Sequence, residues 1–295
     1  MESLALPLPQ SLQYARTCRA LDLDVRCGSA TCASGEALHW QIQSRRLPVL
    51  GRVGLLSRGP VARDPDCLSD WLWRWTSRRN GPLLLNADGL APERLADAGF
   101  WPLITPATLA MLPLGSEKSM RASMKQKWRN RLNRSQSEGL RITRHPLTAS
   151  HWLLSEEPRQ ARERGYKSLP VGLLATYAHV NPGDALIWEA QHKATPLAAI
   201  AILRHGRMAT WQMGVTLPEG RKRNAMNALL WEAMLWLSRN GHETLDLGIL
   251  NSQDAPGLTH FKLGTGARPH RLGGTWLHAG ALAPFARHLP RRLAA

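Results

Sequence analysis

The chain has 295 residues, and 43% of them are apolar, which excludes a wholly disordered protein and leaves room for one large domain or two of ordinary size. It carries 38 Lys and Arg against 22 Asp and Glu, a formal net charge of +16 at pH 7. A positive charge of this size attracts polyanions: nucleic acid, an anionic membrane surface, a phosphorylated cofactor or an acidic carrier protein. The alternative is a basic composition that serves no particular partner.

The cysteines and the first residues set expectations about metals and location. Cys18, Cys27, Cys32 and Cys67 lie in the first quarter of the chain without a CxxC pair. This spacing argues against a metal site or a disulfide scaffold and predicts reduced, buried thiols. The opening MESLALPLPQ is interrupted by prolines, unlike a signal peptide, and no apolar run reaches the roughly 18 residues of a membrane span. We therefore expect a cytoplasmic protein with no transmembrane segment.

The first half alternates predicted helices and strands. A helix at 66–79 places Leu68, Trp71, Leu72 and Trp75 at helical spacing. The other elements, in chain order, are helix 11–21, strands 37–44 and 52–57 around a turn at 47–51, strand 82–86, helix 92–98 and strand 107–112.

The second half gives the same order with a stronger signal. Two helices at 149–163 and 170–179 precede three strands of a meander, 185–190, 197–204 and 208–214. An apolar helix at 224–240, closed by Gly241, is followed by strand 244–249, an amphipathic segment and a last strand at 270–276. This order resembles the GNAT acyltransferase fold. We therefore predict a mixed α/β fold of two tandem GNAT-like modules, residues 1–143 and 144–295.

A basic helix is predicted at 116–138, linking the two modules. Ser116 is a good N-cap, and an apolar stripe recurs every four residues at Met120, Met124, Trp128 and Leu132. The other faces carry cations and no acid between Lys118 and Arg134: Lys118, Arg121, Lys125, Lys127, Arg129, Arg131 and Arg134. This pattern predicts a polyanion-binding surface, because each neutralised phosphate adds salt-dependent affinity. The alternative is a solvated linker.

Segment 214–225 stands where GNAT enzymes hold the pyrophosphate of acetyl-CoA with a glycine-rich [QR]xxGx[GA] loop. If Arg221 opened that pattern, Asn224 would occupy a glycine position. Arg221, Lys222, Arg223 and Asn224 remain candidates for binding a phosphate of the donor. The alternative is an exposed charged loop.

Asp246 is the lone acid of strand 244–249. Pointing inward it must be paired or have a raised pKa, and pointing outward it is an ordinary solvent-facing residue. Lys262 follows Phe261 in the amphipathic segment and, from the pattern alone, is a surface lysine. A lysine there can also stabilise a tetrahedral oxyanion. No Ser/His/Asp order or carboxylate pair stands out, which favours direct transfer over a covalent enzyme intermediate.

Four short segments, in chain order, resemble the Fem family of aminoacyl-tRNA-dependent peptidyl transferases. Together they span almost the whole chain, and each is short. They are Gln10-Ser11 with Tyr14; Arg58-Gly59-Pro60; Lys127-Trp128-Arg129-Asn130 with Gly139-Leu140; and Leu245-Asp246-Leu247-Gly248 with Gly257-Leu258 and Phe261-Lys262-Leu263-Gly264.

The resemblance implies two GNAT-like modules with a cleft between them, and transfer of an aminoacyl group from tRNA to the amine of a small molecule or peptide. The family's functional lysine falls on Lys262, beside Phe261, and the basic helix would face tRNA. Aminoacyl-tRNA is then a co-substrate, and no tightly bound cofactor is expected. Asp246 or the tRNA ribose would receive the proton of the amine.

The chain departs from the family pattern in two places. The long helical insertion of some cell-wall members is absent, and no lysine follows the opening aromatic between Ala15 and Cys18. The missing lysine speaks against a nucleotide-linked peptidoglycan precursor as the acceptor. Two alternative functions remain open at this point: an N-acyltransferase that uses acyl-CoA or an acyl carrier protein, and a non-catalytic RNA-binding protein with a GNAT-like fold.

Overall fold

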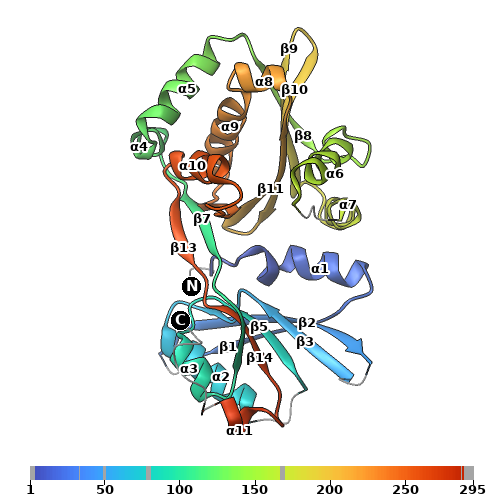
Figure 1. The fold of residues 1–295 in the computed structure, drawn as a ribbon, viewed down its shortest axis with the longest axis vertical. Helices are drawn as coiled ribbons and strands as arrows, with labels where there is room; N and C mark the ends of the chain where they lie inside the picture. Colours follow the sequence, from blue (N-terminus) through green and yellow to red (C-terminus); the bar gives the residue numbers. More distant parts are fainter. Residues whose placement is uncertain are drawn as a thin grey trace. The chain divides into compact units, whose positions relative to one another are not determined.

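A computed structural model describes residues 4–32, 34–48, 51–77, 81–166, 170–286 and 288 (Figure 1). The chain divides into two compact units. Unit 1 comprises Met1–Thr108 and Arg271–Ala295, and unit 2 comprises Leu109–His270. None of the helices in the described part of the chain has the length and apolarity that a membrane crossing requires.

Unit 1 is built on a mixed sheet in the order β1-β2-β3-β5-β14-β6, with β4 paired to β2. β3 and β5 run parallel, and the other pairs are antiparallel. Its elements are η1 (Leu8–Gln10), α1 (Leu12–Ala20), β1 (Asp24–Thr31), β2 (Ala37–Leu47), β3 (Gly51–Ser57), β4 (Val61–Ala62), α2 (Pro65–Thr76), β5 (Leu83–Ala87), α3 (Pro92–Asp97), β6 (Trp101–Ile104), β14 (Gly274–His278) and α11 (Ala283–Ala286).

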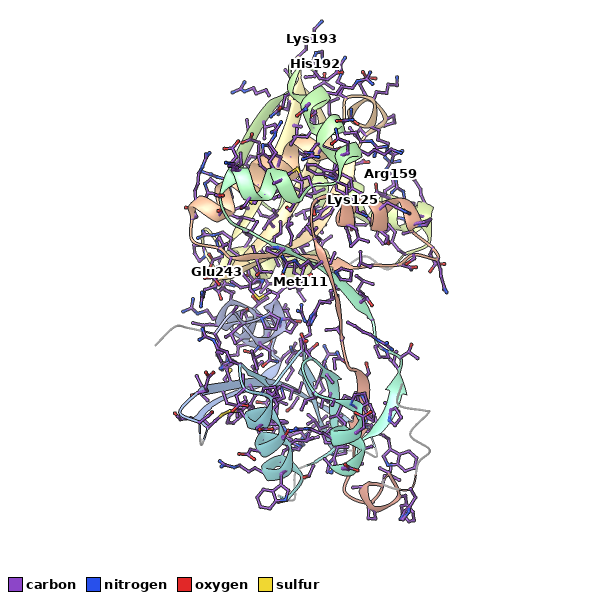
Figure 2. The ribbon with its side chains drawn as sticks, turned by 90° about the vertical axis from the view of Figure 1, so that its left-hand side faces the viewer. Met111, Lys125, Arg159, His192, Lys193 and Glu243 are labelled. Carbon is purple, nitrogen blue, oxygen red and sulfur yellow. A yellow bond between two sulfur atoms is a disulfide. The ribbon has the colours of Figure 1, made fainter. Side chains whose placement is uncertain are left out.

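Unit 2 is built on a second mixed sheet in the order β13-β7-β12-β11-β10-β9-β8, in which β11 and β12 are parallel. The β9–β10 hairpin turns at Lys193 and Ala194, as Figure 2 shows for His192 and Lys193 at its tip. Its elements are β7 (Thr108–Pro113), α4 (Glu117–Ser123), α5 (Gln126–Gln136), β8 (Arg141–Pro146), α6 (Leu153–Arg164), α7 (Val171–Val180), β9 (Ala185–His192), β10 (Thr195–His205), β11 (Met208–Thr216), α8 (Pro218–Lys222), α9 (Ala225–Arg239), β12 (Thr244–Ile249), α10 (Pro256–Gly264) and β13 (Arg268–Arg271).

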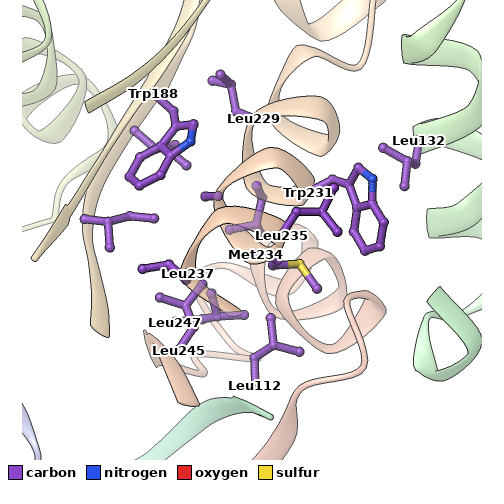
Figure 3. Packing of buried hydrophobic residues seen from close by; sticks show 14 of the residues in the cluster. Leu112, Leu132, Trp188, Leu229, Trp231, Met234, Leu235, Leu237, Leu245 and Leu247 are labelled. Carbon is purple, nitrogen blue, oxygen red and sulfur yellow. The ribbon is translucent and has the colours of Figure 1, made fainter. Parts of the chain in front are cut away.

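Helix α9 is the centre of the unit 2 core (Figure 3). One side, with Leu229 and Leu237, packs toward the sheet, while α6 and α7 lie on the opposite face of that sheet (Figure 1). The outer side carries Trp231, which joins the same core as Leu132 of α5. The helix is apolar around most of its surface because it is covered from two directions.

The two-module α/β fold predicted from the order of elements is confirmed, and nearly every predicted element is present. The elements that were not predicted are η1, β1, β4, β6, β8, α8 and α11, and the predicted strand 270–276 is two strands, β13 and β14, that belong to different sheets. β1 (DVRCGSAT) and β8 (RITRHP) are edge strands with few apolar residues, so they lack the alternation that identifies a half-buried strand. Arg78 and Arg79, the last residues of the predicted helix 66–79, lie outside the described residues, as do Val49 and Leu50 of the predicted turn.

The boundary between the compact units differs from the predicted one after residue 143. β7 pairs with β12 in the sheet of unit 2, and β14 lies between β5 and β6 in the sheet of unit 1. The basic segment thus belongs to unit 2, and the last strand returns to unit 1. Order along the chain could not reveal this division, because strand pairing between distant segments sets it.

The predicted helix at 116–138 consists of two helices, α4 and α5. Met124 is extended (φ −66°, ψ 142°), and the backbone N–H of Lys125 donates to the carbonyl of Gly264 on α10 at 3.0 Å. That bond to a neighbouring helix replaces the intrahelical bond that would continue α4. The predicted N-cap at Ser116 is confirmed, since its side chain accepts from the N–H of Ser119, and all four residues of the apolar stripe are buried.

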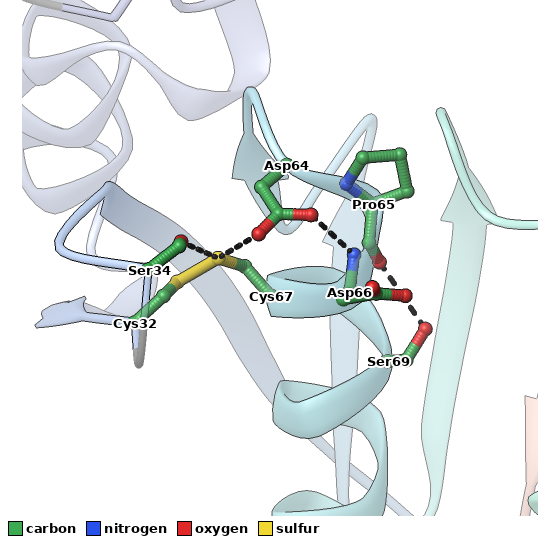
Figure 4. The surroundings of a disulfide bond; sticks show 7 residues. All are labelled: Cys32, Ser34, Asp64, Pro65, Asp66, Cys67 and Ser69. Carbon is green, nitrogen blue, oxygen red and sulfur yellow. Dashed lines mark hydrogen bonds between the residues drawn. A yellow bond between two sulfur atoms is a disulfide. The ribbon is translucent and has the colours of Figure 1, made fainter.

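The prediction of reduced thiols is wrong for two of the four cysteines. Cys32, just after β1, and Cys67, in the first turn of α2, form a disulfide with their Cα atoms 5.6 Å apart (Figure 4). Cys18 is a free, buried thiol and Cys27 a free, exposed one. The bridged residues are 35 positions apart, so only the packing of α2 against the end of β1 brings them together.

Candidate functional site

Lys262 is a buried side chain near the carboxyl end of α10. Only 7% of its surface is exposed, although α10 lies at the surface and Leu258 on the same helix is 45% exposed. Its Nζ donates a hydrogen bond to the carbonyl oxygen of Ile249, the last residue of β12, at 2.8 Å. The interpretation of Lys262 as a surface lysine is therefore wrong.

Burial changes the acid strength of this lysine. Desolvation of the ammonium group lowers the pKa of Lys262 from 10.5 to about 8, and the nearby carboxylate of Asp246 opposes the shift. An amine with a pKa near neutrality inside a packed structure is typical of functional sites, where a group must change or hold its charge at working pH.

Asp246 points inward, which decides between the two orientations left open by the sequence. It is 4% exposed, and its Oδ1 accepts a hydrogen bond from the backbone N–H of Gly248 at 2.7 Å. Gly248 has a φ of +78°, a conformation that a side chain would strain. A Cβ at Gly248 would also lie 3.6 Å from Nζ of Lys262. The positive φ of Gly248 thus bends the chain around the carboxylate, and a side chain there would be in ordinary contact with the ammonium group.

Phe261 packs the helix that carries Lys262 against two tryptophan rings. Its ring lies 5.9 Å from the ring of Trp128 on α5 and 6.2 Å from that of Trp211 on β11, in tilted and edge-on arrangements that aromatic pairs favour. Strands β11 and β12 pair from Met208–Thr244 to Thr210–Asp246. Trp211 follows this paired stretch directly, and its ring contacts Phe261.

The end of α10 is also joined to the start of the basic helix α5. The Lys125 N–H donates to the Gly264 carbonyl, and Trp128 packs on Gly264 so closely that a Cβ there would lie 2.7 Å from its Cδ1. Gly264 therefore allows the close approach of the two helices. Lys125, labelled in Figure 2, is the N-cap residue immediately before α5 and is exposed.

The cations predicted to bind a polyanion lie mostly in solvent. Lys125, Lys127, Arg131 and Arg134 are exposed, as is Lys118 on α4. Arg121 and Arg129 are half-buried and form hydrogen bonds with neighbouring side chains. Arg121 donates to Asn133, and Arg129 donates to Oε1 of Gln126 at 2.6 Å. Arg134 lies 3.7 Å from Glu138. Lys125, the exposed cation at the start of α5, thus lies beside the helix that carries Lys262.

Of the four residues predicted to bind the donor phosphate, Lys222 and Arg223 form ion pairs with carboxylates of the protein. Arg223 pairs with Glu138 at 3.0 Å and Glu219 at 3.2 Å, and Lys222 pairs with Glu219 at 3.1 Å. Arg221 is exposed at the end of α8, and Asn224, with a φ of +51°, precedes α9. Their role in phosphate binding stays a prediction, with Arg221 the cation of the set that is most open to a ligand.

Three parts of this site were not predicted: the Ile249 carbonyl, the ring of Trp211, and the backbone roles of Gly248 and Gly264. Both glycines stand inside the segments that resemble the Fem family. Both glycines can be read in the sequence, but the need for them appears only with the positive φ of Gly248 and the close contact of Gly264 with Trp128.

Residues 118–270, more than half of the chain, match the family model described as acetyltransferase (GNAT) domain. The chain belongs to this GNAT family. It is an acyltransferase, as predicted. The GNAT match covers α4 through β13, and so includes the basic segment, Asp246 and Lys262.

Solved structures share the fold of this GNAT acyltransferase over nearly its whole length. FemX superposes with a TM-score of 0.73 at 13% identity, covering 92% of each chain. A conserved protein of unknown function from Bacteroides thetaiotaomicron has a TM-score of 0.56 at 10% identity, covering 92% of this chain and 90% of that one. The C-terminal domain of a putative lysylphosphatidylglycerol synthetase from Agrobacterium fabrum has a TM-score of 0.51 at 15% identity, covering 95% and 93%. No curated protein sequence matches this one.

The lowered pKa of Lys262 predicts a pH dependence of stability. Between about pH 8 and 10.5 the unfolded chain still binds the proton that the folded chain has released. Unfolding then takes up a proton, so the free energy of unfolding increases as pH rises through this window. The Lys262→Met variant should lose this increase, which urea titrations at pH 7.5, 9 and 10 would measure. An equal increase in both proteins would contradict the assignment.

Proposed function

We propose that this protein transfers an aminoacyl group from aminoacyl-tRNA to an amine, forming an amide bond without the ribosome. The observation that carries the proposal is the direct packing of the basic helix α5 on α10, through Lys125, Trp128, Phe261 and Gly264. A polyanion bound along α5 would bring its end close to Lys262. The resemblance of the same two segments to the Fem family supports tRNA as that polyanion.

In the proposed reaction the acceptor amine attacks the carbonyl carbon of the aminoacyl ester. A C–N bond forms, the carbonyl oxygen becomes an oxyanion, and the C–O bond to the ribose then breaks. Lys262 is the residue proposed to stabilise the oxyanion, because a buried cation interacts more strongly with developing charge than one in water. No covalent enzyme intermediate is required.

The proton of the amine has two routes, to Asp246 or to the departing ribose oxygen. The 4% exposure of Asp246 and its bond to the Gly248 N–H favour the ribose oxygen. Asp246 then serves to keep Lys262 charged, since its carboxylate raises the pKa that burial lowers. Phe261 positions the helix rather than taking part in proton transfer.

The second candidate function is an N-acyltransferase that takes its acyl group from acyl-CoA or an acyl carrier protein. The match to an acetyltransferase family model favours it. Against it, the segment where a glycine-rich loop would hold the pyrophosphate contains the short helix α8, and Arg223 is paired with two carboxylates. Under this function Arg221 would bind the phosphate, and the basic segment would dock an acidic carrier.

Direct binding distinguishes the two donors. The purified protein would be titrated with charged tRNA, acetyl-CoA and a long-chain acyl-CoA, each at 50 and 200 mM salt. We expect binding to tRNA that weakens steeply between the two salt concentrations, and no saturable binding of either CoA. Micromolar CoA binding with only nonspecific tRNA binding would reject the proposal in favour of the N-acyltransferase. Binding of tRNA without transfer to any amine would indicate a non-catalytic RNA-binding protein.

A further inference from the structure

Unit 1 contains a cavity of about 350 Å³ that the proposed reaction does not use. It lies between strands β1, β2 and β3 on one side and helix α2 on the other. Its lining residues alternate along β2, at Leu38, Trp40, Ile42 and Ser44, as expected for one face of a strand. Every residue that lines the cavity belongs to unit 1, so this unit forms the cavity by itself.

Three indole rings form a continuous wall of the cavity. Trp71 and Trp75 of α2 stack with their centroids 5.3 Å apart and their planes at 19°, and Trp40 of β2 is tilted against Trp71 at 6.2 Å. Trp40 lies across Gly28 of β1, where a Cβ would come within 2.2 Å of the ring. The sequence therefore keeps a glycine where the indole needs space.

The disulfide closes the wall at one end. Cys32 and Cys67 both line the cavity and join the end of β1 to the first turn of α2 (Figure 4). Asp64 caps the same turn by accepting from the N–H of Asp66 at 2.9 Å. The strand side and the helix side of the cavity are thus covalently linked, which keeps their separation fixed.

Positive charge surrounds this apolar interior. Arg26, Arg52 and Arg74 line the cavity against one acid, Asp70. Arg52 forms an ion pair with Asp24. Arg26 is exposed on the strand side of the cavity, on β1, and Arg74 is exposed on its helix side, on α2. A ligand with an apolar body and an anionic end fits this distribution, because its charge meets guanidinium groups while its body leaves water.

The size and shape of the wall favour a flexible chain. A cavity of ~150 Å³ holds the six carbons of benzene, so about 350 Å³ holds roughly fourteen carbons. Trp71 and Trp75 already face each other, and Trp40 is tilted at 55° to Trp71, so the walls do not form a flat slot for a rigid ring system. A chain can follow such a surface by rotation about its single bonds.

We propose that unit 1 binds an acyl chain with an anionic head group, the chain along Trp40, Trp71 and Trp75 and the head at Arg26 and Arg74. This site goes beyond the proposed transfer reaction, which depends on residues of unit 2. It provides the protein with a second ligand, either a soluble acyl anion or the chain of an anionic lipid.

Titration calorimetry with decanoate, kept below its micelle concentration, tests the site on the full chain. We expect one saturable site, and none for decyltrimethylammonium, which has the same chain under a cationic head. Arg74→Glu should weaken decanoate binding by about tenfold or more, while Arg46→Glu, an equal charge change on β2 outside the cavity, should leave it within about twofold.

A second pair of variants tests the apolar part. Ala30→Phe places a ring in the cavity and should abolish binding, whereas Ser29→Phe, on the exposed neighbouring position of β1, should not. Circular dichroism shows whether each variant is folded. If Ala30→Phe does not fold, the test rests on the comparison of Arg74→Glu with Arg46→Glu. Binding of 2-naphthoate in place of decanoate, no saturable binding, or equal binding by each variant and its control would overturn the proposal.

A vesicle-binding assay then distinguishes a lipid from a soluble acyl anion as the source of the acyl chain. Co-sedimentation with phosphatidylglycerol vesicles that Arg74→Glu abolishes would identify a lipid as the ligand. Decanoate binding without co-sedimentation would identify a soluble acyl anion. Transfer activity is assayed separately in the same variants, and its persistence distinguishes a failure at this site from a failure of the proposed function.

Discussion

Replacing Lys262 with alanine is expected to abolish acyl transfer while leaving tRNA affinity within about twofold of the unmodified protein. The loss should be on the order of 10²- to 10³-fold in turnover, the effect of removing one stabilising group from an oxyanion site. RNA affinity should persist because the cations exposed to solvent belong to the segment of α4 and α5, whereas Lys262 is a buried residue of α10. The measurement is single-turnover transfer from charged tRNA, beside a filter-binding assay.

Two further variants make this test specific. Lys193→Ala removes an exposed lysine at the tip of the β9–β10 hairpin and should leave turnover unchanged. Lys262→Arg retains a cation that stays charged above pH 8, so any remaining activity should no longer decline as pH rises above about 8, the pKa given to Lys262 by burial. Full turnover in Lys262→Ala would remove this residue from the mechanism.

Replacing Lys125, Lys127, Arg129 and Arg131 together with glutamate is expected to weaken tRNA binding strongly and to reduce its dependence on salt. Each phosphate contact contributes about 0.7 to 0.9 to the slope of log affinity against log salt, so losing four contacts should lower the slope by about three. The apolar side of α5, with Trp128 and Leu132, is unchanged, so the fold should be retained. Affinity would be measured between 50 and 300 mM salt.

The matched control changes three exposed cations elsewhere in unit 2, Arg162 and Arg164 on α6 and Lys193, to glutamate. These substitutions lower the net charge in the same way per residue but lie outside the basic segment. Their effect should be the smaller one expected from net charge alone. If the two sets of variants have equal affinities and equal slopes, α4 and α5 do not form the binding surface.

Much of the fold could be predicted from the sequence, because long apolar periods identify elements independently of their partners. Helix α9 and strands β9, β10 and β11 lie close to their predicted ranges. The edge strands β1 and β8 lacked that signal, since hydrogen bonds to one neighbour, rather than a buried face, hold them in place. The bridge between Cys32 and Cys67 also depends on a contact between distant segments.

The candidate site shows the same limit at the level of single residues. The sequence placed Asp246 on a strand and Lys262 on the following helix, but its pattern could not say that both are buried. Their burial depends on the bend at Gly248 and on the close approach of α5 to α10 at Gly264. Only the resemblance to a family pointed to Lys262, and the contacts now give a physical reason for its lowered pKa.

The position of β14 has a consequence for how the chain acquires its structure. This strand, Gly274–His278, lies inside the sheet of unit 1, between β5 and β6, although all of unit 2 precedes it in the chain. During synthesis, the ribosome releases every residue of unit 2 before unit 1 can close its own sheet. Unit 2 can therefore fold first. Until β14 is synthesised, the edges of β5 and β6 that pair with it remain unpaired.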